Sequence, residues 1–262
     1  MTGEQDPSRR GFLKVLVGLS AVVAAGGLGK GVVQNLVTPS VGLTSFPETQ
    51  LYWVNPNSGN SAPVPLKSEE FQMNSPSIWI YYYPLSDEPN FIIKLGKIET
   101  NGKEIPVKVD PVTVTIDATG TTFLSPGGVG KDSNIVSFSA ICQHLGCIPP
   151  VIHYYPPSEI DSLPANVKAA IAAQNTNGEL DYGVIHCNCH GSTYNPFMGA
   201  GIVTHPTYRP LPNVILKWDP ITDYLYAKKL IGPVVFGHPS DLTGGNAISN
   251  LKKSTVIKMS SS

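Results

Sequence analysis

The chain carries two short motifs that combine cysteine and histidine: C-Q-H-L-G-C from Cys142 to Cys147, and C-N-C-H-G-S from Cys187 to Ser192. We call them box one and box two. They hold all four cysteines of the 262-residue sequence, and each adds one histidine and one glycine. Two cysteine, histidine and cysteine sets on tight loops offer four metal ligands and one further pair of thiols. This count suits a two-iron cluster with mixed ligation.

The boxes resemble those of the Rieske iron–sulfur proteins of quinol-oxidising cytochrome bc-type complexes, which read C-T-H-L-G-C and C-x-C-H-G-S. Both boxes match, including the second cysteine of each. Rieske ferredoxins and ring-hydroxylating oxygenases are similar in ligands but lack these second cysteines, so the resemblance is to the high-potential branch. It implies that Ser192 and Tyr194 donate hydrogen bonds to sulfurs of the cluster, which raises its reduction potential.

The resemblance also implies a role for the other box residues in binding one [2Fe-2S] cluster. The implied metal ligands are Cys142 and Cys187 on one iron, and His144 and His190 on the other. Cys147 and Cys189 would form a disulfide that ties the two loops together. Structural zinc is the alternative for a group of cysteines and histidines, but Gly146, Gly191 and the two hydroxyl residues in register favour the cluster.

The implied chemistry is the oxidation of quinol. His144 and His190 would each bind iron through one ring nitrogen, leaving the other at the surface, where it can change protonation. We expect His190 to contact the quinol, although the spacing alone does not distinguish it from His144. One electron and one proton would leave the quinol together, and the electron would pass to a cytochrome or copper acceptor.

The protein would therefore be a redox subunit of a respiratory oxidoreductase complex, together with a membrane subunit of the cytochrome b type. Two alternative functions have different consequences. In one, the chain is the Rieske small subunit of a molybdenum oxidoreductase such as arsenite oxidase, where the cluster is an electron relay and no quinol binds. In the other, it is an exported binding module stabilised by zinc, without a redox role.

The N-terminus is typical of a twin-arginine export signal. Arg9, Arg10 and Lys14 precede an apolar stretch that runs from Val15 to Leu28. We expect residues 1–37 to stay uncleaved as a single transmembrane anchor in contact with lipid, with the head domain on the extracytoplasmic side of the cell membrane. Export to an oxidising compartment would also permit the disulfide. Residues 38–50 would form a linker.

Residues 51–262 would form the head domain. Short apolar and β-branched runs between turn residues predict an all-β fold: 51–54, 77–83, 91–95, 105–109, 112–116, 135–139, 214–218 and 224–228. A helix is expected at 164–174. The resemblance implies an antiparallel β-sandwich base domain with an inserted cluster-binding subdomain at about 137–212, plus the N-terminal transmembrane helix.

Three segments depart from the common pattern or remain unassigned. The insert at 148–186, between the boxes, resembles that of archaeal respiratory Rieske proteins and would serve packing or partner binding. The loop at 201–211 matches the cluster-covering proline loop of the family only at Pro206. The tail at 241–262 is expected to be a surface arm or an edge strand. With a net charge of −1 and no basic stripe, the chain is not expected to bind nucleic acid.

Overall fold

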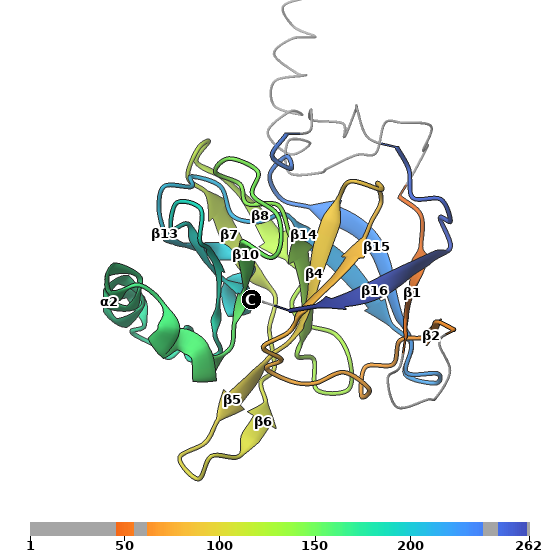
Figure 1. Cartoon of the computed structure of the whole chain (residues 1–262), viewed down its shortest axis with the longest axis horizontal. Coiled ribbons are helices and arrows are strands. Elements are labelled where there is room, and N and C mark those ends of the chain that lie inside the picture. The colour runs from red at the N-terminus through yellow and green to blue at the C-terminus, as the bar shows by residue number, and fades with distance from the viewer. Residues whose placement is uncertain (1–45, 55–61, 238–245, 261–262) are drawn as a thin grey trace, which may run out of the picture.

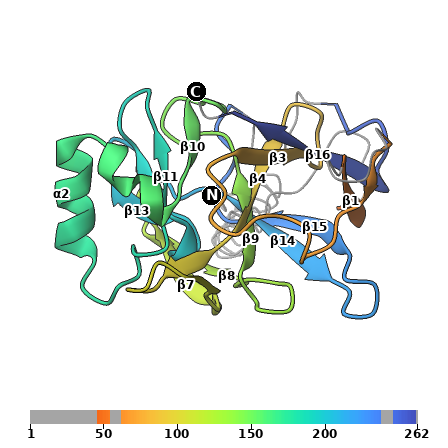
Figure 2. The same cartoon turned by 60° about the horizontal axis from the view of Figure 1, so that its bottom comes forward.

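The computed structural model describes residues 46–54, 62–237 and 246–260 and shows a mostly β protein (Figure 1). A large curved sheet lies on one side, and a smaller sheet with helix α2 (Ala165–Gln174) beside it lies on the other; Figure 2 shows the same division from a second direction. The predicted signal and anchor at 1–37 lie outside the described residues. Within those residues, no helix has the length and apolar character needed to cross a membrane.

Among the described residues, the large sheet has eight strands in the order β15-β14-β9-β4-β3-β16-β1-β2. β1 also pairs with β15, so the sheet closes on itself like a barrel. The strands of this barrel are β1 (Thr49–Trp53), β2 (Val64–Pro65), β3 (Ile78–Tyr82), β4 (Pro89–Lys94), β9 (Ile135–Ser139), β14 (Asn213–Trp218), β15 (Leu225–Ile231) and β16 (Lys253–Met259).

The smaller sheet is antiparallel and carries the second box. Its strands, in spatial order, are β10 (Ile152–Tyr155), β11 (Val184–Cys187), β12 (Thr193–Asn195) and β13 (Gly201–Thr204). Outside the two sheets lie the hairpins β5 (Gly96–Ile98) with β6 (Glu104–Pro106) and β7 (Val112–Ile116) with β8 (Thr121–Ser125), and the short helices η1 (Pro157–Ser162) and η2 (Pro196–Met198).

The predicted secondary structure is largely confirmed, because every predicted strand run overlaps a strand and the predicted helix at 164–174 is α2. The predicted β-sandwich is wrong. β1 pairs antiparallel with β15 on one side and parallel with β16 on the other, so one sheet curls round instead of two sheets stacking. The inner face carries Leu51 and Val256, which pack into a common core.

The expectation for the C-terminal tail is also wrong. Residues 253–259 form β16, which lies between β1 and β3 in the order of the barrel strands and is not at an edge. Ser254 and Val256 are buried, whereas Lys253 and Thr255 are exposed. This period of two places a strand in the barrel wall with one face in the core and one in solvent.

The insert at 148–186 builds a small core of its own against the smaller sheet. Val167 and Ile171 of α2 are buried together with Val203 of β13. The Nε2 atom of Gln174 donates to the backbone oxygen of Val203 at 2.6 Å. The helix therefore covers β13, the last strand of this sheet, and packing accounts for this part of the insert.

A second core joins the barrel to the smaller sheet. Phe91 and Phe138 from the barrel pack with Ile185 from the smaller sheet, and the buried Cys142 and Cys187 belong to the same group of side chains. Burying one large apolar side chain stabilises a fold by about 1.5–3 kcal/mol. The first cysteine of each box is therefore held where the two parts of the fold meet.

Glu88 is a fully buried acid on the barrel side of this junction. Ser139, the last residue of β9, donates from Oγ to Glu88 Oε1 at 2.8 Å. Burial raises the pKa of Glu88 well above its usual value of 4.5. The folded protein thus holds a proton that the unfolded chain releases, and the resulting stability is present below about pH 4.5 and lost as the pH rises toward the folded pKa.

Replacing Glu88 with glutamine is expected to raise the free energy of unfolding at pH 8, because the amide stays neutral. The gain should grow by at most about 1.4 kcal/mol per pH unit above pH 4.5, and it should vanish near pH 4. Denaturant unfolding at pH 4, 6 and 8 measures it, with the exposed Glu69→Gln as control. A gain of the same size at every pH would contradict a buried, protonated Glu88.

Candidate metal centre

The two boxes fold into loops with the same backbone pattern. In box one, Cys142 N donates to Cys147 O at 2.8 Å and Gly146 N donates to Cys142 O at 2.9 Å. In box two, the first, fifth and sixth residues repeat both bonds, each at 2.9 Å: Cys187 N to Ser192 O, and Gly191 N to Cys187 O. The fifth residue has a positive φ in both loops, +78° and +94°, which glycine adopts without steric cost. The spacing within the boxes is thus the spacing of one repeated turn.

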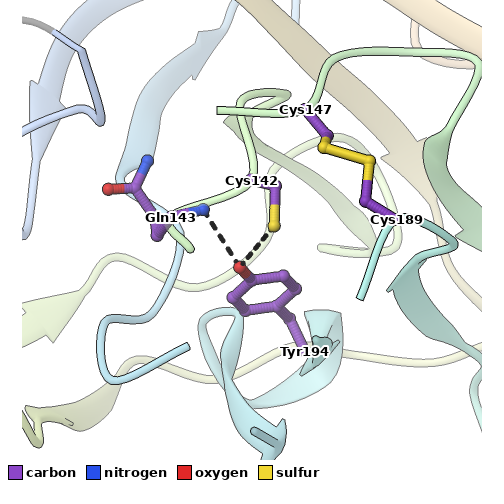
Figure 3. The surroundings of a disulfide bond; sticks show 5 residues. All are labelled: Cys142, Gln143, Cys147, Cys189 and Tyr194. Atoms are coloured by element: carbon purple, nitrogen blue, oxygen red, sulfur yellow. Dashed lines mark hydrogen bonds between the residues drawn. A yellow bond between two sulfur atoms is a disulfide. The ribbon is translucent and has the colours of Figure 1, made fainter. Parts of the chain in front are cut away.

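The predicted disulfide is confirmed. Cys147 and Cys189 are bonded to each other (Figure 3), whereas Cys142 and Cys187 are free and buried. The sulfurs of Cys147, Cys187 and Cys189 lie within 4.8 Å of one another. Cys147 and Cys189 belong to the disulfide and are therefore not available as thiolate ligands. The free thiols of Cys142 and Cys187, one from each box, are available.

The pocket around the free thiols favours a thiolate, the form of cysteine that binds metals. The pKa of Cys142 is lowered from 9.0 to about 5, chiefly because the Cys187 thiol donates a hydrogen bond to its sulfur. Tyr194, the backbone of His144 and Ser192 also donate to this sulfur. The same shared proton and burial raise the pKa of Cys187. As the pH rises, Cys142 therefore loses its proton at a lower pH than Cys187.

The two box histidines lie beside each other. Their rings meet edge to face, with centroids 5.0 Å apart and an angle of 83° between planes. His190 is exposed, whereas His144 is half-buried. Nδ1 of His144 is buried and has no hydrogen-bond partner among the described residues. An orphaned buried nitrogen is costly unless something binds it, and a metal ion is a group that an imidazole nitrogen binds. The donor set therefore fits a cluster held by two thiolates and two imidazoles.

Tyr194 directs its hydroxyl at a free sulfur. Its Oη lies 3.4 Å from Cys142 Sγ and accepts a hydrogen bond from Gln143 N at 3.1 Å (Figure 3). Because the backbone N–H supplies one hydrogen, the tyrosine's own hydrogen is free to point at the sulfur. Tyr194 and Ser192 are both fully buried. The structure thus brings together both hydroxyl residues that the motif predicts.

Two contacts to the boxes were not predicted from the sequence. Thr207 N donates to Ser192 Oγ at 3.2 Å, so the loop at 201–211 does lie against box two. A Cβ placed on Gly146 would come within 2.7 Å of the Phe236 ring, which belongs to the segment after β15. The sequence matches the loop that contains Thr207 to the cluster-covering loop of the family, but the contact of Thr207 itself, like that of Phe236, is revealed only by the three-dimensional structure.

Gly146→Ala is expected to lower cluster content and thermal stability. A left-handed conformation costs about 1–2 kcal/mol for a non-glycine residue, and the overlap with Phe236 adds to it. Gly191→Ala is the matched control, because its φ is also positive but its Cβ would meet nothing within 4 Å. Iron content and melting temperature should fall further in the first variant, and Phe236→Ala should remove that difference. Equal losses in both single variants would contradict the contact.

Two further histidines, His153 and His186, lie outside the boxes and have partners of their own. Nδ1 of His153 is 2.8 Å from Pro150 O, and Nδ1 of His186 is 2.8 Å from Thr193 Oγ1. Burial lowers the pKa of both rings, that of His186 to about 4. They are buried packing residues with local partners.

Residues 99–215 match the sequence profile of the Rieske [2Fe-2S] domain. Among solved structures, the soluble domain of the Rieske protein II (soxF) from Sulfolobus acidocaldarius is similar, with 28% sequence identity, a TM-score of 0.37 and coverage of 58% of this chain. The match spans 66% of that chain, just under two thirds of its length. The profile and the donor set agree on an iron–sulfur cluster in place of structural zinc. The chain therefore contains a Rieske [2Fe-2S] domain, which occupies residues 99–215 and binds a two-iron cluster.

Proposed function

We propose that this electron-transfer protein is the high-potential Rieske subunit of a quinol-oxidising respiratory complex. When bound, the cluster accepts one electron and passes it on. We assign Cys142 and Cys187 to one iron, and His144 and His190 to the other. His190 would accept the proton of the quinol hydroxyl at its outward ring nitrogen, and a cytochrome or copper protein would take the electron.

The observation that carries this proposal is the surface around the histidines. His190 is exposed, and so are three apolar side chains, one within box one and two that follow it closely in the sequence. We call them the apolar rim: Leu145, Ile148 and Val151, with 56%, 53% and 41% of their surface exposed. Leu145 follows His144 in the chain, and the backbone oxygen of Val151 accepts a hydrogen bond from Asn188 N of box two at 2.9 Å. An imidazole framed by apolar groups suits a quinol head group, which has an apolar ring and polar hydroxyls.

The potential expected for quinol oxidation is supported by the hydroxyl donors. Tyr194 and Ser192 donate toward Cys142, and such bonds stabilise the more negative reduced state. The disulfide is the second feature shared with the high-potential branch. In the described residues, nothing specifically favours the relay function of an arsenite oxidase subunit.

We further propose a membrane location. The twin-arginine pattern and apolar stretch of residues 1–37 support export and retention of an anchor in the cell membrane, next to lipid and a subunit of the cytochrome b type. The predicted linker at 38–50 extends too far, because Thr49 and Gln50 belong to β1; the segment before β1 would link the anchor to the head on the extracytoplasmic side. Cell fractionation with an alkaline carbonate wash tests this; a protein released by the wash would contradict a spanning anchor.

The function is tested by titrating the cluster-loaded, full-length protein at several pH values and then mixing it with a short-chain benzoquinol. We expect a high potential that falls with rising pH, approaching about 59 mV per unit for one proton per electron, and rapid reduction by the quinol. A low potential that does not change with pH, without reduction by quinol, would contradict the proposal and indicate a relay.

Leu145→Ala is expected to slow reduction by quinol about tenfold while leaving the potential unchanged. The loss corresponds to about 1.4 kcal/mol, close to the lower limit for burying a leucine side chain. Leu124→Ala is the matched control, because Leu124 on β8 is 61% exposed and lies outside the boxes. Equal rates in both variants would exclude the apolar rim from the reaction.

A further inference from the structure

We infer that Thr207 is a positioning residue that sets the hydrogen bond from Ser192 to the cluster, and through it the reduction potential of the cluster. The inference rests on the ligand assignment made under the proposed function, not on the identity of the electron donor. Thr207 belongs to the loop that follows β13, and only 1% of its surface is exposed. It belongs to neither box.

The contact between Thr207 and box two is made by the backbone. Thr207 N donates to Ser192 Oγ at 3.2 Å. A serine hydroxyl turns freely about its C–O bond and can donate in several directions. Because Oγ already accepts this N–H, the serine hydrogen is free to point toward Cys142, whose sulfur receives a hydrogen bond from Ser192. The Thr207 backbone therefore selects the direction in which Ser192 donates.

The threonine hydroxyl holds this backbone in place. Its Oγ1 donates to Arg209 O at 2.9 Å and accepts from Arg209 N at 3.2 Å, which closes a local turn of the kind that serine and threonine favour. The carbonyl of Thr207 lies 2.9 Å from His205 Nδ1. With its N–H, carbonyl and hydroxyl all engaged, Thr207 is fixed by partners on both sides along the chain.

The test is the midpoint potential of full-length, cluster-loaded variants at pH 7. Thr207→Val removes the hydroxyl and keeps the side-chain shape and backbone N–H. Loss of the hydroxyl that holds the Thr207 backbone is expected to lower the reduction equilibrium about threefold, or close to 28 mV at 59 mV per tenfold. Thr207→Ser keeps the hydroxyl and should retain the wild-type potential. An unchanged potential in Thr207→Val would overturn the inference.

Two controls separate positioning from general damage. Thr49 is also fully buried and donates from its hydroxyl to a backbone oxygen, Leu251 O, at 2.7 Å in the barrel. Thr49→Val should lower stability without changing the potential. In a Ser192→Ala background, Thr207→Val should shift the potential no further, because it acts through that hydroxyl. A full additional shift there would refute the mechanism.

If the Thr207→Val variant binds too little cluster, the potentials of Thr207→Ser and Thr207→Ala are compared instead. The serine variant must then load and keep the wild-type potential, whereas the alanine variant must shift it; equal potentials would overturn the inference. If the quinol assay fails while the Thr207 shift is observed, the proposed substrate is wrong and the positioning role stands. If the quinol reduces the protein but Thr207→Val does not shift the potential, only the positioning role is refuted.

Discussion

Cys187→Ser is expected to leave the protein without its cluster, with nearly all iron and visible absorbance lost. Cys187 is one of two free, buried cysteines, and its thiol shares a proton with Cys142. A serine hydroxyl has a much higher pKa than a thiol and is a poor ligand for iron in a cluster that is usually held by thiolates. Iron content, absorbance and electron paramagnetic resonance of the reduced protein measure the loss.

Ser192→Ala is the matched control for this loss, because it changes a buried polar residue of the same box without removing a proposed ligand. It should retain the iron and lower the potential. Full iron content in the Cys187→Ser variant would contradict the ligand assignment and direct attention to the sulfurs of Cys147 and Cys189, which lie near the same site.

Removal of the disulfide by Cys147→Ala together with Cys189→Ala is expected to cost about 4 kcal/mol of the free energy of unfolding, in the chain-entropy treatment of a cross-link. The bond joins residues 42 positions apart in the sequence. The double substitution adds no unpaired thiol to those of Cys142 and Cys187, whereas either single one would. Guanidinium unfolding of the metal-free protein measures the cost.

The same variant should also lose its cluster faster, because the disulfide is the covalent link between the two boxes. Chemical reduction of the wild-type disulfide is the control and should reproduce both effects. A cost below about 1 kcal/mol would mean that backbone hydrogen bonds and packing hold the loops together without the bond.

The sequence predicts the site better than the surrounding fold because the box residues are close together in the chain. Each box is one turn closed by its first, fifth and sixth residues, so spacing alone carries the information. Closure of the barrel has no local signal. It depends on β1 pairing with β15, where Thr49 lies opposite Ala227 and Gln50 opposite Tyr226.

Long-range packing also explains why the sequence did not predict the roles of some residues. Glu88 lies in a polar stretch, S-D-E-P, that reads as a surface turn, yet its carboxyl is fully buried against Ser139. Thr207 and Phe236 become part of the site only because their segments return to the boxes. A single sequence records which side chains are polar or apolar, but not which loop they meet.

The position of β16 has a consequence for the order of events during synthesis. β1 near the start of the described chain has β16 as its parallel neighbour, and β3 lies on the other side of β16. The barrel wall therefore stays open until residue 259 has left the ribosome, although both boxes emerge much earlier. At about 5–20 residues per second, the delay between Ser192 and that point lasts seconds. The cluster pocket, which is buried against the barrel, is completed only after translation of the last strand.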